Sequence, residues 1–322
     1  GGVLKGYLDL TLPLKDEDEP LITGVTEGTG LSFQAGSNSP LISDCSFQAD
    51  FSGKSATLNR CDLKAGEDSD LSITGEIRGW GGIEGDIKVH SDYLNLSDII
   101  HKGSELSSSD ITRHMNLTIG LDVSEGRLNK FPCRQAQADL ILERGNLFIK
   151  DSAIHLDYGD MNITGHVLKF PEKEMFFAGD VTIKDQPAEE LFESLGINYK
   201  GLKGKISIDG SLSAKGRGKD EMLSGLGGSG SVLITKGLIK NPSIMIKVLD
   251  FLSLQKIFEE RPPDLGEEGL YFESISADAL VEDGVLKSEN FIMRSPVLNA
   301  VAEGSADMTK KYISCTLFAQ PH

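Results

Sequence analysis

The sequence contains few basic residues, few aromatic residues and few cysteines, and these shortages exclude several classes of function. Its 322 residues include 32 Lys and Arg against 49 Asp and Glu, which gives a formal net charge of −17. Such a negative surface repels a phosphate backbone and anionic headgroups, so we expect no nucleic-acid partner and no membrane docking by charge alone. Aromatic residues make up 7% of the chain and include one Trp, which argues against a carbohydrate-binding domain with an exposed aromatic platform.

Signatures of catalysis and of metal binding are also missing. The six histidines are scattered, and His155 with Asp157 offers only two groups where a metal site needs three or four ligands. The glycine-rich segment 225–230 precedes a predicted strand, whereas a phosphate-binding loop precedes a helix. We therefore predict that the protein is not an enzyme and that it uses neither a cofactor nor a metal ion.

Long apolar runs are absent as well. The sequence shows no signal peptide and no apolar run of about 18 residues that would span a bilayer. It starts at Gly1 without a Met and enters strand-like sequence at once. We expect the chain to be a fragment of a longer protein whose membrane anchor lies elsewhere.

The cysteines, four in number, have neither metal-ligand nor C-x-x-C spacing. Cys45 and Cys61 flank a predicted hairpin with its turn near Gly53. A three-residue turn places the two cysteines opposite each other, as a cross-strand disulfide requires. A two-residue turn instead pairs Ala49 with Leu58 and offsets the cysteines by one residue. The sequence leaves both registers open, and the second matches the apolar faces better.

Apolar and polar residues alternate with a period of two along most of the chain. In 71–77, for example, Leu71, Ile73 and Ile77 point one way, while Ser72 and Thr74 point the other. Turn signals separate such segments about every 10–12 residues, the spacing of antiparallel meanders. We predict a mostly β fold with a long curved antiparallel sheet. Its apolar face either packs on a second layer or curls around space for another apolar group, and the sequence leaves both open.

Helical patterns are rare. A short helix is predicted over 187–195, with Pro at its first turn and Gly196 after its end. A long helix that is apolar on most of its circumference is predicted over 242–258. It caps one end of the sheet, contacts a membrane or forms part of the core, and we favour the cap. Its candidate contact residues are Ile244, Val248, Phe251, Leu252 and Phe258.

The polar, Ser-rich segment 103–110 is the best candidate for a boundary. We divide the chain into a β-groove segment over 1–110, which continues from a missing N-terminal part, and a C-terminal β region over 111–322. The second region includes the predicted helix 242–258.

The order of several motifs resembles AsmA-like proteins, and among them the YhdP-type branch. A "G-x-L-x-I-x-x-S" strand occurs at 145–152 and a "G-x-x-x-I-T-G" strand at 159–165. A short helix at 186–196 and a glycine-rich strand at 224–239 follow, and a strand pair at 269–286 comes later. Each motif is weak alone, and the resemblance rests on their order over most of the chain.

The resemblance implies a β-groove (β-taco) fold in a protein of the Gram-negative cell envelope. It implies an anchor in the inner membrane, a β structure that extends through the periplasm, and transport of phospholipid for outer-membrane biogenesis. Its partners would be phospholipid and components of both membranes. The alternative is a scaffold that helps outer-membrane proteins assemble by strand pairing. The residues that we expect to line the groove are Leu117, Ile119, Leu140, Leu142, Ile163, Val181, Ile183, Ile206, Ile208 and Leu212.

Overall fold

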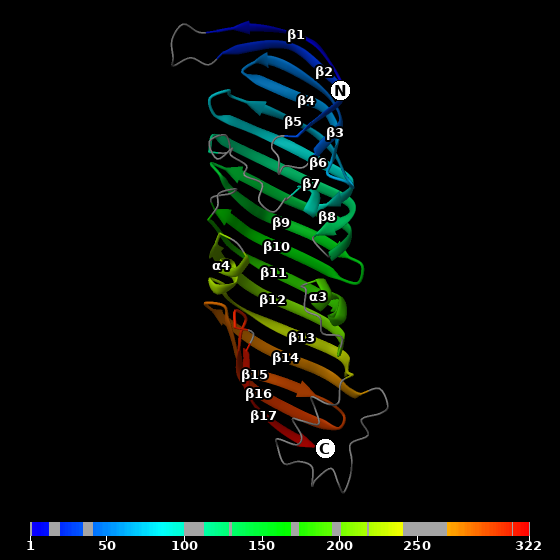
Figure 1. Cartoon of the computed structure of the whole chain (residues 1–322), viewed down its shortest axis with the longest axis vertical. Coiled ribbons are helices and arrows are strands. Elements are labelled where there is room, and N and C mark those ends of the chain that lie inside the picture. Colours follow the sequence, from blue (N-terminus) through cyan, green and yellow to red (C-terminus); the bar gives the residue numbers. More distant parts are fainter. Residues whose placement is uncertain are drawn as a thin grey trace. The chain divides into compact units, whose positions relative to one another are not determined.

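The computed structural model confirms a mostly β chain, in which strands account for most of the described residues (Figure 1). The structure describes residues 2–12, 20–34, 41–99, 113–128, 131–168, 174–194, 201–217, 219–240, 269–310 and 312–321. They fall into two compact units. The N-terminal unit comprises Gly1–Asp157 and Ile163–Met175, and the C-terminal unit comprises Tyr158–Asn162 and Phe176–His322.

In the N-terminal unit, nine strands lie side by side in chain order and form a curved sheet (Figure 1). Each pairs with the next, and the pairs are antiparallel except for β6 with β7. The strands are β1 (Val3–Thr11), β2 (Leu21–Gln34), β3 (Leu41–Gly53), β4 (Ser55–Ala65), β5 (Ser69–Arg78), β6 (Ile83–Asn95), β7 (Met115–Leu128), β8 (Phe131–Glu143) and β9 (Asn146–Leu156).

In the C-terminal unit, the strands again follow one another in chain order. From β12 to β17 each strand pairs with the next in antiparallel fashion, and hydrogen bonds such as that from Thr182 to Asp209 link β11 to β12. The strands are β11 (Met175–Pro187), β12 (Leu202–Gly216), β13 (Gly227–Ile239), β14 (Leu270–Glu282), β15 (Val285–Arg294), β16 (Leu298–Asp307) and β17 (Tyr312–Pro321). Strand β10 (Asp160–Leu168) has residues in both units.

Burial follows the alternation that predicts these strands. On β5, Ile73 and Ile77 are half-buried while Ser72 and Thr74 are exposed, and the same alternation continues across β6. Successive side chains of a strand point to opposite faces, so one face of the sheet is apolar and the other is polar. We call them the apolar face and the polar face.

The parallel pairing of β6 with β7 departs from the expected antiparallel meander. Gly85 lies opposite Leu117 and Ile87 opposite Ile119, with both strands running in the same direction. A parallel pair needs a crossover connection instead of a hairpin, and the short helix α1 (Leu96–Ile99) lies in that connection. The Ser-rich segment 103–110, predicted as a boundary, lies outside the described residues, and the division of the chain at residue 110 stays a prediction. Strands β6 and β7, which precede and follow that segment in the sequence, are paired with each other.

The β3–β4 hairpin has the two-residue turn that the apolar pattern favours. Gly53 has a φ of 66°, a conformation that glycine adopts without steric cost. Beyond the turn, Ala49 pairs with Leu58, as that register predicts. Two bulges then change the register, one at Asn59 and one between Ser43 and Ser46.

The helices among the described residues are short and lie at strand ends. The predicted helix at 187–195 is confirmed as α3 (Ala188–Ser194), which has acidic residues in its first turn and contacts β12 through a face where Ala188 and Leu191 are buried. Helix α4 (Lys219–Ser224), which the sequence did not predict, also contacts β12. Within the described ranges, no helix has the length and apolarity needed to cross a bilayer. The long helix predicted over 242–258, with Ile244, Val248, Phe251, Leu252 and Phe258, lies outside the described residues.

Candidate functional site

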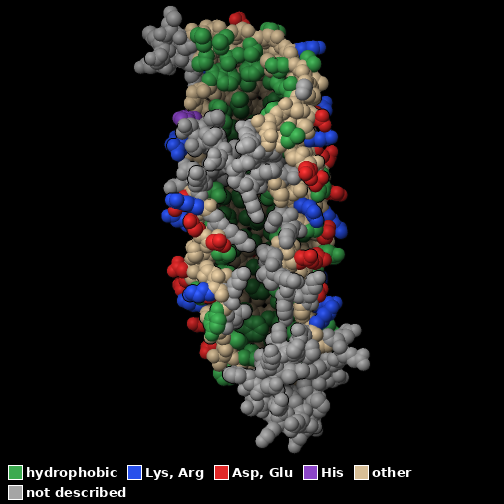
Figure 2. Space-filling model, in the orientation of Figure 1, with side chains coloured by type: hydrophobic (Ala, Val, Ile, Leu, Met, Phe, Trp, Pro, Cys, Tyr) green, Lys and Arg blue, Asp and Glu red, His purple; other side chains and the backbone are tan. Residues whose placement is uncertain are grey.

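The apolar face carries side chains that line up from strand to strand. In the N-terminal unit one row runs Ile87, Ile119, Leu140 and Ile149 across β6 to β9. A row on each side of it is also largely apolar, because side chains two residues apart on a strand share a face. In the space-filling view, hydrophobic side chains line hollows between flanks that carry Lys, Arg, Asp and Glu (Figure 2).

In the C-terminal unit the apolar row is longer. It runs across six strands through Ile206, Ile234, Ile275, Met293, Ala300 and Ala319. The first five of these are between 2% and 7% exposed. A neighbouring row contains Ile208, Val232 and Ala277, and these three are only half-buried. We call the surface formed by such rows in each unit the apolar trough.

Partial exposure in the middle of the strands distinguishes the trough from an ordinary core. Ile208 and Leu212 on β12 are half-buried, whereas Ile206 and Ala214 on the same face are buried. A core residue touches neighbours on all sides, whereas these half-buried side chains keep part of their apolar surface accessible. Among the described residues, part of the trough surface is therefore left uncovered.

The residues predicted to line a groove lie on strands as expected. The register places Leu117, Ile119, Leu140, Leu142, Ile206, Ile208 and Leu212 on the apolar face. Val181 and Ile183 flank Thr182, whose hydroxyl bonds Asp209 on the polar face, so they point to the apolar face. Ile163 is half-buried on β10, and Ser152 exchanges hydrogen bonds of 2.7 and 2.8 Å with its backbone.

Each unit contains a phenylalanine ring that covers a glycine on the neighbouring strand. Phe272 lies opposite Gly237, and a Cβ on that glycine would be 2.1 Å from the ring. Phe47 lies opposite Gly28, where the corresponding distance is 2.4 Å. The rings therefore lie against bare backbone. This pairing could not be predicted from the sequence, because only the register reveals which glycine faces which ring.

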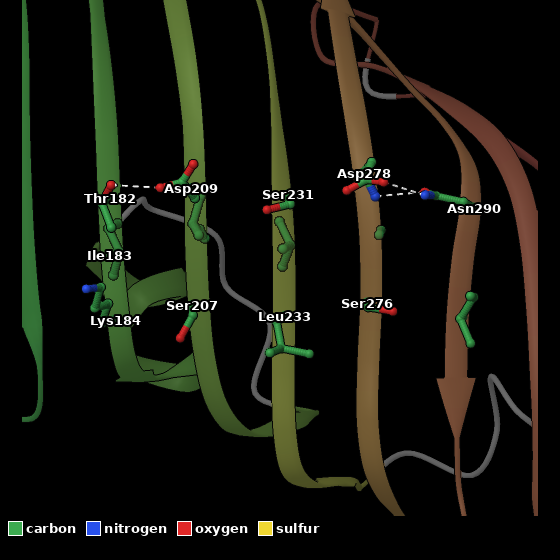
Figure 3. A pocket seen from close by; sticks show the side chains of 14 residues that line it. Thr182, Ile183, Lys184, Ser207, Asp209, Ser231, Leu233, Ser276, Asp278 and Asn290 are labelled. Carbon is green, nitrogen blue, oxygen red and sulfur yellow. Dashed lines mark hydrogen bonds between the residues drawn. The ribbon is translucent and has the colours of Figure 1, made fainter.

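The polar face is held by side-chain hydrogen bonds between strands (Figure 3). Thr182 donates to Asp209 over 2.9 Å, and Asn290 donates to Asp278 over 2.5 Å while accepting from its backbone N–H over 2.8 Å. These residues line a hollow of about 450 Å³ together with Ser231 and Leu233, and Leu233 is 45% exposed. A second hollow, of about 530 Å³, lies on the polar face of the N-terminal unit around Gly120.

His90 lies at the edge of that second hollow between two carboxylates. Its Nδ1 is 3.0 Å from Asp122 Oδ2, and its Nε2 is 3.4 Å from Asp92 Oδ1. The hydrogen bond to Asp122 is the main reason why the pKa of His90 is raised above 6.5. Gln137 donates to Asp122 over 3.1 Å, and this bond, followed by that from His90, lowers the pKa of Asp122.

The described residues contain no cluster of three or more His, Cys, Asp or Glu side chains arranged to hold a metal ion. The rows of the apolar trough named above consist of Ile, Leu, Val, Met and Ala side chains. An apolar surface of this kind can bind alkyl chains, since each CH₂ group removed from water contributes about 0.8 kcal/mol without any specific partner.

Comparison with known proteins agrees with the resemblance noted in the sequence. No curated protein and no solved structure gave a significant match. A family model described as "YhdP protein" matches residues 42–321, which is most of the chain. The protein whose apolar trough and hydrogen-bonded polar face are described above therefore belongs to the YhdP family.

Proposed function

We propose that the apolar trough carries the acyl chains of phospholipids. The observation that supports this function most directly is the half-buried state of aligned aliphatic side chains such as Ile119, Leu140, Ile208 and Val232. These residues hold apolar surface that the described part of the chain leaves partly exposed. A bound alkyl chain would complete their burial.

The energetics favour a sliding cargo over a fixed one. Aliphatic contacts are non-directional and scale with area, so a chain that moves by one strand exchanges one set of contacts for an equivalent set. The half-buried row of Ile208, Val232 and Ala277 also varies little in chemistry from strand to strand. Movement along the trough therefore meets no strong trap, and the function needs no catalytic group.

The proposed setting is the periplasm of a Gram-negative bacterium. There the parent protein is anchored in the inner membrane and passes phospholipid between the inner and outer membranes. Membership of the YhdP family supports this setting. The net charge of −17 suits a surface that does not adhere to anionic headgroups or nucleic acid.

The test compares two adjacent residues on opposite faces of β13. Val232 is half-buried on the apolar face, and Leu233 is 45% exposed on the polar face. We expect the chain purified from a bacterial envelope to retain phospholipid in native mass spectrometry and lipid extraction. Val232→Glu should reduce bound lipid roughly tenfold or more, since an unpaired carboxylate beside alkyl chains costs more than about 1.4 kcal/mol. Leu233→Glu should retain the wild-type amount.

A clean lipid-free mass for the wild-type chain, together with no uptake from phosphatidylethanolamine vesicles, would count against the proposal. Equal lipid in the two variants would show that any bound lipid sits outside the trough. Circular dichroism on both variants establishes that the sheet is retained.

A second candidate function is strand pairing with an outer-membrane protein during its assembly. The observation in its favour is β1, all of whose residues are exposed, with Val3 and Tyr7 on one face and Leu4 and Leu8 on the other. An apolar strand with both faces exposed is suited to sheet extension. If this function holds, Tyr7→Pro should abolish capture of an unfolded β-barrel protein and leave lipid content unchanged.

A further inference from the structure

We propose that Cys45 on β3 and Cys61 on β4 form a disulfide that links these two strands on the apolar face. The two residues belong to neighbouring antiparallel strands of the N-terminal unit. All four thiols of the chain are free in the structure, so the proposal adds a covalent bond that would form under oxidising conditions.

The bulges of the β3–β4 hairpin bring the two thiols to the same face. An uninterrupted two-residue hairpin would offset Cys45 from Cys61 by one residue and so place them on opposite faces. The extra residue at Asn59 shifts the register so that Cys61 lies opposite Phe47. Cys45 is two residues from Phe47 along β3, which makes it the diagonal neighbour of Cys61.

The second bulge lies beside Cys45 on β3. The register breaks between Ser43 and Ser46, and Asp44 there has a φ of 51°, an uncommon conformation for a residue with a side chain. Cys45 is also among the groups that raise the pKa of Cys61, which agrees with two thiols that lie near each other. Cys45 is 5% exposed, while Cys61 is half-buried. An oxidant therefore reaches Cys61 first, and Cys45 is placed to resolve the product.

The reaction is an ordinary thiol–disulfide exchange with a small disulfide such as glutathione disulfide. The Cys61 thiolate attacks one sulfur, the glutathione S–S bond breaks, and one glutathione thiolate leaves and takes a proton. The Cys45 thiolate then attacks the Cys61 sulfur of this mixed disulfide, and the second glutathione leaves and is protonated. In total the protein loses two electrons and two protons, and two glutathione molecules are produced.

The surroundings of the pair determine when the bond forms. Burial first, and then the neighbouring Cys45 thiol and Asp62, raise the pKa of Cys61 to about 11, so little of the attacking thiolate is present near neutral pH. In the folded chain the exchange is therefore slow. It is faster while the hairpin is still forming and the thiols are in water. The bond then acts as a structural cross-link rather than as a rapid switch.

The experiment refolds the full chain in a glutathione redox buffer and compares it with folded, reduced chain exposed to glutathione disulfide. After quenching and alkylation under denaturing conditions, intact mass and peptide mapping locate each thiol. We expect refolded protein to carry a Cys45–Cys61 bond, with Cys133 and Cys315 alkylated. Folded protein should form the same bond at a rate that rises about tenfold per pH unit towards pH 11, following the thiolate fraction.

Two variants separate the role of Cys61, which reacts first with the oxidant, from the role of Cys45, which resolves the mixed disulfide. Cys45→Ala should leave Cys61 as a mixed disulfide with glutathione, and Cys61→Ala should leave Cys45 unmodified in the folded chain. Refolded wild-type protein should unfold at a higher denaturant concentration when oxidised than when reduced, a difference that Cys45→Ala abolishes. Cys133 is buried without a cysteine on its paired strands and serves as the matched control.

Persistence of a glutathione adduct on Cys61 in refolded wild-type protein would overturn the proposal, because Cys45 would then be unable to resolve it. Alkylation of both cysteines after refolding would overturn it as well. Neither result bears on the lipid trough, which is tested through Val232 in the other unit.

Discussion

Two adjacent residues of β12 differ in the kind of contact that they make. Ile206 lies opposite Ile234 on the apolar face. Ser207 lies on the polar face, where its hydroxyl accepts a hydrogen bond of 3.2 Å from the backbone N–H of Asp185. Neighbouring residues of one strand thus contribute in different ways. The apolar face is held by contacts that accept any alkyl group of suitable size, whereas the polar face uses donors and acceptors with fixed partners. We therefore propose that the polar face fixes the strand register and leaves the apolar face able to accept cargo.

The largest stability change is expected when a buried residue of the apolar row is truncated. Ile206 is 2% exposed, so Ile206→Ala should cost about 2–5 kcal/mol of unfolding free energy through lost burial and a cavity. Lys205→Ala, an exposed neighbour on the other face, should change it by no more than about 0.5 kcal/mol. Urea denaturation followed by circular dichroism measures both. Similar small effects in the two variants would mean that the apolar row is not a source of stability.

Substitutions at two glycines should change the stability by an intermediate amount. Gly237 is covered by Phe272, whereas nothing lies within 4 Å of a Cβ built on Gly120. Gly237→Ala should destabilise the chain by about 1–3 kcal/mol because the ring must move. Gly120→Ala should be neutral or stabilise it by up to about 1 kcal/mol, since alanine loses less backbone entropy in a strand. If both changes were equally harmful, the ring would not be the cause.

The smallest expected effect concerns pH and the polar face. Because the folded pKa of His90 is raised, its protonated form contributes stability at pH values below the unfolded pKa near 6.5, and this contribution is lost as the pH rises through the folded pKa. Replacing Asp122 by Asn should lower the pKa of His90, which NMR titration of its ring protons measures. Asp92→Asn is the weaker comparison, because its hydrogen bond to His90 ranks below that of Asp122. An unchanged titration in Asp122→Asn would exclude the pairing.

Much of the β structure could be read from the sequence, since period-two alternation reports directly which side of a strand is buried. The alternation at 71–77 and the hairpin pairing of Ala49 with Leu58 are both confirmed. The bulges at Asn59 and between Ser43 and Ser46 were not foreseen, because an inserted residue leaves no compositional mark. The parallel β6–β7 step was missed for a related reason: alternation gives faces but not strand direction.

Features of the candidate site divide in the same way. Residues such as Ile119 and Ile208 could be assigned to one face from periodicity alone, and the structure places them there. The coverage of Gly237 by Phe272 and the placement of Cys45 and Cys61 on one face depend on registers set by tertiary pairing. Whether a face is open or covered also depends on what lies above it, which a single strand's sequence does not encode.

The contacts between successive strands described for each unit have a consequence for length. Neighbouring strands lie about 4.8 Å apart, so the length of an array of this type is proportional to the number of its strands. Adding or deleting a hairpin would change the length of the apolar face by about 10 Å and leave the pairing of distant strands intact. Evolution can therefore match such a chain to the distance between two surfaces by duplication alone, without redesigning a core.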